Sequence, residues 1–166
     1  MFLLDTPVVA ELRKAKTGQT DPGLIGWAGG VAQQNLFISA LSLLELEAGV
    51  AQAERRDKQA AESLRTWLDS HVPRAFEGRI LAVDAAVAKR RGQVLINDTR
   101  DALMVATAQV HGLTIVTRNA SAFKAGKVKT FNPWGYRPDA LTDDNTDWRE
   151  GTRAGPMWFK NLFLRF

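Results

Sequence analysis

Residues 2–7 read Phe2-Leu3-Leu4-Asp5-Thr6-Pro7, so a carboxylate stands directly between a short apolar run and the start of a helix. The apolar run predicts a buried β-strand. Thr6 is expected to be the N-cap and Pro7 the first helical residue, because proline lacks the N–H group that this position leaves unpaired. Asp5 is therefore predicted to end a strand, with a side chain that capping does not require.

Short strands and helices continue to alternate along the chain. Strands are predicted near residues 36–38, 79–83, 113–116 and 128–131, and helices near 22–33, 40–56, 58–70, 84–95 and 99–111. In the helix that Asp84 is expected to cap, Val87, Val94 and Leu95 are predicted to face inward. This alternation predicts an α/β fold with a parallel, doubly wound sheet.

The length of 166 residues suits one main domain. After Pro133 and Trp134 the composition changes to an acidic, weakly apolar stretch, and the chain ends in an aromatic segment. We predict a domain at residues 1–134, followed by an acidic linker and an aromatic tail of unknown role at residues 135–166. A reading-frame extension and a docking segment are both open interpretations of this tail.

The composition excludes several classes of site. The chain has no cysteine, which excludes disulfides, thiolate catalysis and cysteine-type zinc sites, and two histidines are too few for a histidine-rich metal site. The net charge of +4 favours polyanionic partners, although solubility alone explains it equally well. No apolar run is long enough to span a membrane, and no signal peptide is recognised, so we predict a cytoplasmic protein without membrane contact.

Acidic residues interrupt apolar stretches at several distant positions. In an open parallel sheet, ligands bind at the carboxyl ends of the strands, and Asp5, Glu45 and Asp101 are all predicted near that edge. No lysine or arginine lies three or four residues from Glu45 to pair with it. Two alternatives remain: Ser42 and Glu45 as a capping box, and Asp98 as N-cap of a helix with Asp101 at its third position.

A cluster of carboxylates needs a cation, and ligands that are all oxygen favour Mg²⁺ or Mn²⁺. Such an ion can make a bound water nucleophilic and neutralise charge on a phosphodiester. Thr117 and Asn119 follow a predicted buried strand and are candidates to orient the water or a carboxylate, with ordinary turn residues as the alternative. Asp98 is a candidate fourth ligand. Arg13, Arg100 and Arg118 are candidates to influence which RNA is bound, but they are interpreted first as solvated surface charges.

Four segments together resemble the PIN domain, and more narrowly the VapC and FitB-like toxins of bacterial toxin–antitoxin pairs. They are Leu3-Leu4-Asp5-Thr6-Pro7-Val8-Val9-Ala10-Glu11-Leu12, Ile38-Ser39 with Glu45-Leu46-Glu47-Ala48-Gly49, Asp101-Ala102-Leu103-Met104-Val105-Ala106-Thr107-Ala108, and Leu113-Thr114-Ile115-Val116-Thr117-Arg118-Asn119 with Asn132-Pro133-Trp134. The resemblance covers about residues 1–134 and rests on four motifs in the same order and spacing.

The resemblance implies a three-layer α/β/α fold with a short, mostly parallel five-stranded sheet. It implies an endoribonuclease that depends on Mg²⁺ or Mn²⁺, with Asp5, Glu45 and Asp101 as metal ligands. It also implies a homodimer that a small VapB- or FitA-like antitoxin inhibits, and binding of the complex to operator DNA. RNA is the implied substrate.

Two positions depart from the family pattern. Pro7 stands where the family usually has asparagine, and Ala122 stands where it usually has a fourth acid before Phe123. A second hypothesis is therefore a catalytically impaired PIN module that acts mainly by binding its antitoxin and DNA. A third is a receiver-like or phosphatase-like domain with Asp5 as phosphoryl acceptor, but this chain lacks a second acid beside Asp5.

Overall fold

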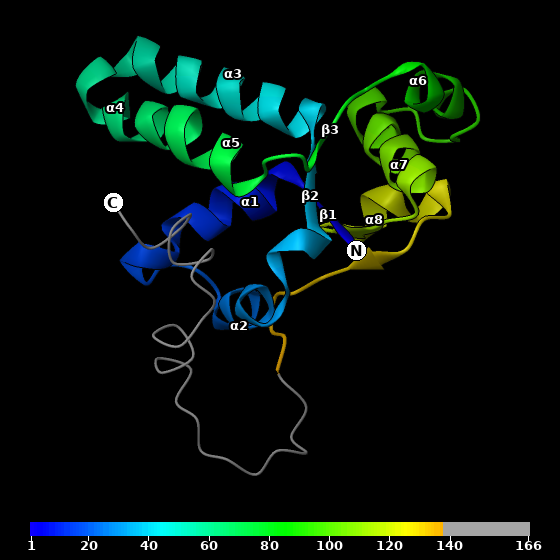
Figure 1. Cartoon of the computed structure of the whole chain (residues 1–166), viewed down its shortest axis with the longest axis horizontal. Helices are drawn as coiled ribbons and strands as arrows, with labels where there is room; N and C mark the ends of the chain where they lie inside the picture. The colour runs from blue at the N-terminus through cyan, green and yellow to red at the C-terminus, as the bar shows by residue number, and fades with distance from the viewer. Residues whose placement is uncertain (138–166) are drawn as a thin grey trace.

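Five short strands form one parallel sheet at the centre of the computed structural model, which describes residues 1–137 (Figure 1). The strands are β1 (Phe2–Leu4), β2 (Leu36–Ser39), β3 (Ile80–Leu81), β4 (Thr114–Val116) and β5 (Thr130–Phe131). Their spatial order is β3-β2-β1-β4-β5, and each neighbouring pair is parallel. The predicted sheet is confirmed, and β1 is its central strand.

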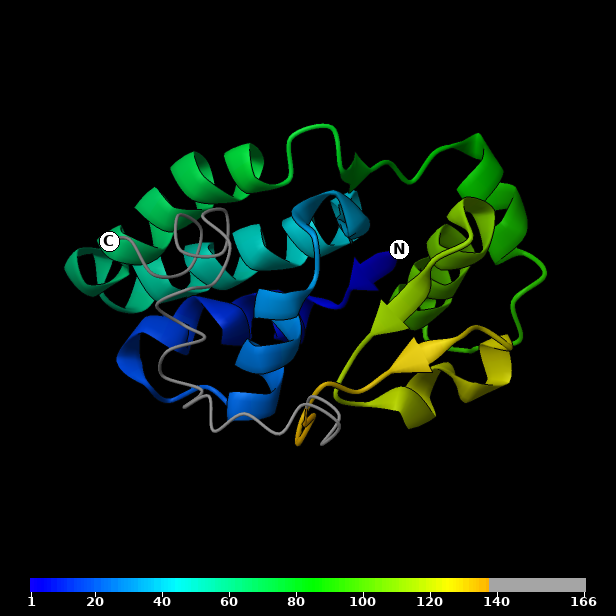
Figure 2. The same cartoon turned by 60° about the horizontal axis from the view of Figure 1, so that its bottom comes forward.

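Helices cover both faces of the sheet, as Figures 1 and 2 show. One side carries α1 (Thr6–Arg13), α2 (Pro22–Gly30), α3 (Ala40–Arg56), α4 (Lys58–Thr66) and α5 (Val72–Ala75), with a π-helical turn at Trp67–His71 between α4 and α5. The other side carries α6 (Ala85–Arg91), α7 (Thr99–His111) and α8 (Ala120–Phe123). Short 3₁₀ turns lie at Lys14–Thr17, Gln33–Asn35 and Lys124–Gly126. The three-layer α/β/α architecture that the resemblance implied is therefore confirmed.

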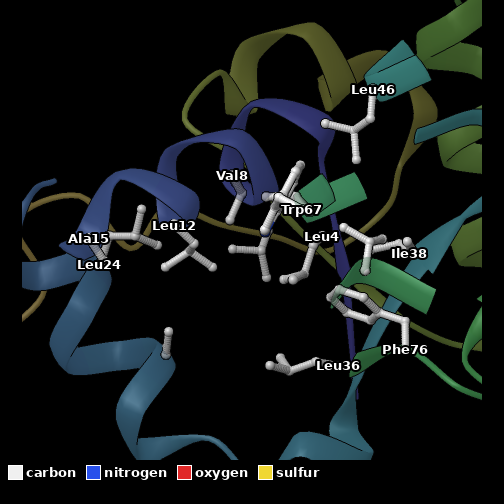
Figure 3. Close-up of a cluster of buried hydrophobic side chains, with 14 of the residues drawn as sticks. Leu4, Val8, Leu12, Ala15, Leu24, Leu36, Ile38, Leu46, Trp67 and Phe76 are labelled. Atoms are coloured by element: carbon white, nitrogen blue, oxygen red, sulfur yellow. The ribbon is translucent and has the colours of Figure 1, made fainter. Parts of the chain in front are cut away.

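Each face of the sheet has its own hydrophobic core. Consecutive strand residues point to opposite faces, so Leu4 joins the cluster under α1 to α5 while Leu3 joins the cluster under α6 to α8. Figure 3 shows the first cluster, in which Trp67 and Phe76 are the largest fully buried side chains. Both faces of β1 are thus buried, which explains its uninterrupted apolar sequence.

Several predicted element boundaries are confirmed. The helices expected at 40–56 and 99–111 have those limits in α3 and α7. The Asp84 side chain accepts a hydrogen bond from the Val87 N–H, so it caps α6 as predicted. Gly112 ends α7 in the left-handed conformation, with a φ of 64°.

Other boundaries were predicted wrongly. Asp5, not Thr6, is at the N-cap position of α1, because its backbone is extended while Thr6 is already helical; as predicted, the Asp5 side chain makes no capping hydrogen bond. The helix expected to reach residue 95 ends at Arg91, where the Gln93 and Val94 N–H groups close turns onto Arg90 and Arg91. Leu95 is consequently 84% exposed instead of facing inward.

The helices expected at 22–33 and 58–70 also end early as α-helices. The first ends at Gly30, within a glycine pair that favours helix termination, and the second becomes a π-helical turn at Trp67. The predicted tail at residues 138–166 lies outside the described residues, and the boundary at residue 134 stays a prediction. In the described part of the chain, no helix has the length and apolar character needed to cross a membrane.

Candidate active site

A cavity of about 440 Å³ opens at the carboxyl edge of the sheet, beside the ends of β1 and β4. The chain continues from β1 outward to β2 and β3 and returns to place β4 on the other side of β1, so this edge is a topological switch point. The cavity is lined by Asp5, Thr6, Pro7, Ala10, Glu45, Arg100, Asp101, Asn119, Ala122 and Phe123. Three of the predicted carboxylates therefore share one cavity.

Asp5 is held at the end of β1 by backbone and side-chain contacts. Its N–H donates to the Val116 carbonyl at 3.0 Å, which joins the ends of β1 and β4. The fully buried Thr117 hydroxyl donates to Asp5 Oδ2 at 2.8 Å. Asp5 is only 4% exposed, and the Thr117 hydroxyl holds one of its two carboxylate oxygens.

Glu45 reaches the cavity from the second turn of α3. Ser39 caps this helix by accepting a hydrogen bond from the Leu41 N–H, while the Ser42 hydroxyl faces Met104 Sδ at 3.9 Å. The alternative of a Ser42–Glu45 capping box is therefore wrong. Glu45 Oε2 instead accepts a hydrogen bond from the Thr6 hydroxyl.

Asp98 and Asp101 have different positions at the start of α7. Asp98 is the N-cap, and its Oδ1 accepts a hydrogen bond from the Asp101 N–H at 2.8 Å. Asp98 is not among the described residues that line the cavity, whereas Asp101 is. The role of Asp98 as a metal ligand stays a prediction, and one of its oxygens already serves as the helix cap.

Arg100 joins the three cavity carboxylates. Its Nη2, Nε and Nη1 atoms donate to Asp5 Oδ1, Glu45 Oε1 and Asp101 Oδ1 respectively, the last at 2.6 Å. Burial by itself lowers the pKa of Arg100, but the hydrogen bonds from Arg100 to Glu45, Asp5 and Asp101, together with the charge of Asp5, outweigh burial and raise that pKa above its ordinary value. Arg100 therefore keeps its charge, and the interpretation of this residue as a solvated surface charge was wrong.

One local feature of the sequence points to anionic partners for Arg100. A cation in the first turn of a helix opposes the helix dipole, so an arginine there needs nearby anions. Arg100 occupies that turn of α7, next to Asp101. Its other two partners, Asp5 and Glu45, are 95 and 55 residues away in the chain, and so no local pattern could identify them.

Asn119 and Ala122 form another part of the cavity wall. The Asn119 N–H donates to the Thr117 hydroxyl at 3.0 Å, which extends the chain of contacts from Asp5 to the loop after β4. The Asn119 side chain accepts a hydrogen bond from the Ser121 hydroxyl at 2.6 Å. Ala122 brings only a methyl group to the cavity.

The three carboxylates have the chemistry of a magnesium or manganese site, since all their donor atoms are oxygen. They converge on one cation, the Arg100 guanidinium, and their three formal negative charges exceed its single positive charge. Within residues 1–137, however, no three acidic or histidine side chains are placed to hold a metal ion together. The three carboxylates fit such an ion if Arg100 releases the oxygen atoms to which it is hydrogen-bonded.

Comparisons with known proteins agree with this fold. The PIN domain family model matches residues 3–128. The toxin FitB of Neisseria gonorrhoeae is 31% identical over 144 residues, covering 81% of this chain and 99% of FitB. The VapC ribonuclease Y4jK of Sinorhizobium fredii is also 31% identical over 144 residues, covering 81% of this chain and 98% of Y4jK.

Solved structures give the same result. The crystal structure of FitAcB from Neisseria gonorrhoeae matches with a TM-score of 0.73 at 30% identity, covering 81% of this chain and 99% of that chain. The structure of FitAB bound to the IR36 DNA fragment matches with a TM-score of 0.71 at 27% identity, covering 84% and 99%. This chain belongs to the PIN domain family.

Proposed function

We propose that this protein is the endoribonuclease toxin of a toxin–antitoxin pair and hydrolyses RNA phosphodiesters with the help of Mg²⁺ or Mn²⁺. The observation that carries the proposal is the convergence of Asp5, Glu45 and Asp101 on one cation at the carboxyl edge of the sheet. The relatives named as a toxin and as a ribonuclease support it, because they match nearly their whole length.

The polar residues at the cavity other than Arg100 each have a proposed part in the reaction. Asp5, Glu45 and Asp101 would hold the ion, while Thr117 orients the Asp5 carboxylate and Thr6 orients Glu45. Asn119 lines the cavity and is proposed to position water or a phosphate oxygen. When bound, the ion would neutralise charge developing on the phosphodiester and favour attack by water.

Chelation of divalent ions tests this proposal directly. We expect the purified full-length protein to cleave RNA with Mg²⁺ or Mn²⁺, and to lose cleavage when excess EDTA is added, because carboxylates alone cannot neutralise phosphodiester charge. Gel analysis of a single-stranded RNA, before and after metal is restored, measures the effect. Cleavage that persists in EDTA would show that the activity is not metal-dependent.

The proposed partners are an antitoxin of the VapB or FitA kind and, through that antitoxin, operator DNA. The solved structures of FitAcB and of FitAB bound to DNA support this assignment, at 30% and 27% identity. The active form is proposed to be a homodimer. The net charge of +4 is consistent with RNA and DNA as polyanionic partners.

Expression in a bacterial host is expected to arrest growth, and co-expression of the product of the neighbouring open reading frame is expected to restore it. Growth curves after induction measure both effects. The D5N variant serves as control, because it removes a proposed ligand and is expected to keep the fold. Growth arrest by D5N equal to that of the unaltered protein would mean that toxicity does not come from the cavity.

A second candidate function keeps the fold without strong catalysis. Ala122 supplies no fourth carboxylate to the cavity, and this favours a module that acts mainly by binding its antitoxin and, as a complex, DNA. Titration with Mn²⁺ together with the growth assay separates the two functions. Weak Mn²⁺ binding without growth arrest supports the impaired module, whereas tight binding with arrest supports the nuclease.

A further inference from the structure

We propose that Arg100 is an internal counter-cation, which competes with the divalent ion for the three cavity carboxylates and so sets how tightly this chain binds metal. The inference rests on the proposed metal dependence of the site and adds a residue outside the predicted ligand set. It follows from which oxygen atoms Arg100 occupies, from the charge of the cavity, and from the geometry of a guanidinium.

Arg100 takes the oxygen atoms that other groups leave available. Asp5 accepts Thr117 on Oδ2 and Arg100 on Oδ1, and Glu45 accepts Thr6 on Oε2 and Arg100 on Oε1. Each of these two carboxylates therefore has one oxygen oriented by a threonine and the other bound to Arg100. A metal ion that bound the carboxylate oxygens not held by a threonine would need the same atoms that Arg100 occupies.

The negative charge of the cavity makes both cations plausible occupants, and the shared oxygen atoms mean that they cannot bind at once. Arg100 is the only basic residue among the described residues that line the cavity, and each of the three acids forms its ion pair with it. Buried or half-buried carboxylates without a cation are costly, so Arg100 stabilises the protein when no metal is bound. A divalent ion that displaces Arg100 offsets two of the three negative charges, whereas Arg100 offsets one.

The shape of the arginine side chain explains why it suits this place. A guanidinium is planar and presents donors in several directions, and here three different nitrogens each contact a different carboxylate. The side chain is also 30% exposed, so it borders solvent at the cavity mouth. A lysine ammonium is a single compact charge and could not satisfy three separated carboxylates equally well.

Three variants of the full-length protein test the competition. In R100A, Mn²⁺ affinity measured by isothermal titration calorimetry is expected to rise by about tenfold or more, because the competing cation is gone. The metal-free R100A protein is expected to melt at a lower temperature than the unaltered protein, and its melting temperature is expected to rise more when Mn²⁺ is added. R100K is expected to lie between the two in both measurements.

R118A is the matched control, because it removes an equal charge from the loop after β4. Arg118 lies over the Trp134 ring at 5.6 Å and is outside the described cavity lining. The Mn²⁺ affinity of R118A is therefore expected to stay within about twofold of that of the unaltered protein. If metal-free R100A does not fold, the comparison of R100K with the unaltered protein decides the question, with the same direction expected.

The possible results distinguish this inference from the proposed function. Equal or weaker Mn²⁺ binding by R100A and R100K, with binding by the unaltered protein intact, overturns the competition and leaves the metal-dependent nuclease standing. A similar rise in R118A would reduce the effect to general electrostatics and also overturn it. Absence of Mn²⁺ binding by every variant overturns both the competition and the metal dependence.

Discussion

Replacing Asp5 with asparagine is expected to lower metal-dependent RNA cleavage by at least about a hundredfold, since even residues that only support metal ligands change activity by about 10- to 100-fold. Asp5 is 4% exposed, and its two oxygens contact Thr117 and Arg100. Asparagine has nearly the same size but no charge, so the cavity would lose one of its three negative charges. Initial cleavage rates at several Mn²⁺ concentrations measure the loss.

D57N is the matched control for this substitution. Asp57 is also at the N-cap position of a helix, and its Oδ1 accepts a hydrogen bond from the Ala60 N–H, a contact that asparagine can replace. We expect D57N to cleave RNA at the unaltered rate. Circular dichroism should show both variants folded. A folded D5N protein that retains more than about a tenth of the activity would contradict the assignment of Asp5 as a ligand.

Leu4→Ala is expected to lower the free energy of unfolding by about 2–5 kcal/mol, because the shortened side chain leaves a cavity in a close-packed core. Leu4 is fully buried in the cluster shown in Figure 3, on the central strand of the sheet. Since Asp5 follows it directly, loosening of β1 should also weaken metal binding. Urea denaturation of the metal-free protein measures the change.

Leu95→Ala provides the comparison for this stability prediction. Leu95 is 84% exposed, and its truncation is expected to change the free energy of unfolding by less than about 0.5 kcal/mol. The two variants remove the same atoms, so most of the difference between them reports burial. A loss below about 1 kcal/mol in L4A would mean that β1 is not the rigid centre of the fold.

Helix limits that depend on local chemistry were predicted well. Asp84 and Gly112 mark the start of α6 and the end of α7, because capping and left-handed backbone are properties of a few adjacent residues. The end of α6 was missed because Val94 and Leu95 continue a helical apolar pattern although the chain turns after Arg91. Gly92 at the C-cap and the basic last turn mark this end, whereas apolar periodicity alone does not reveal it.

In the candidate site too, the features that depend on neighbouring residues were predicted, and those that depend on distant residues were not. Asp5, Glu45 and Asp101 were identified because each is a carboxylate at the end of a strand or the start of a helix, and parallel strands bring such positions to one edge. Arg100 was misread because its role depends on partners from β1 and α3. The capping role of Asp98, by contrast, was among the predicted alternatives, because its hydrogen bond is made to a residue three positions along the chain.

The sequence alone determined the order of strands and helices along the chain, the parallel sheet, and the edge where three acids gather. Apolar runs, caps and strand ends depend on neighbouring residues and can be recognised from them. Which oxygen atoms face one another, and the presence of Arg100 among them, were decided only by the tertiary structure. The physical reason is that a long cationic side chain forms hydrogen bonds with whichever anions folding brings within reach. Asp5 and Glu45 come from segments far from Arg100 in the chain, so their positions depend on the tertiary structure.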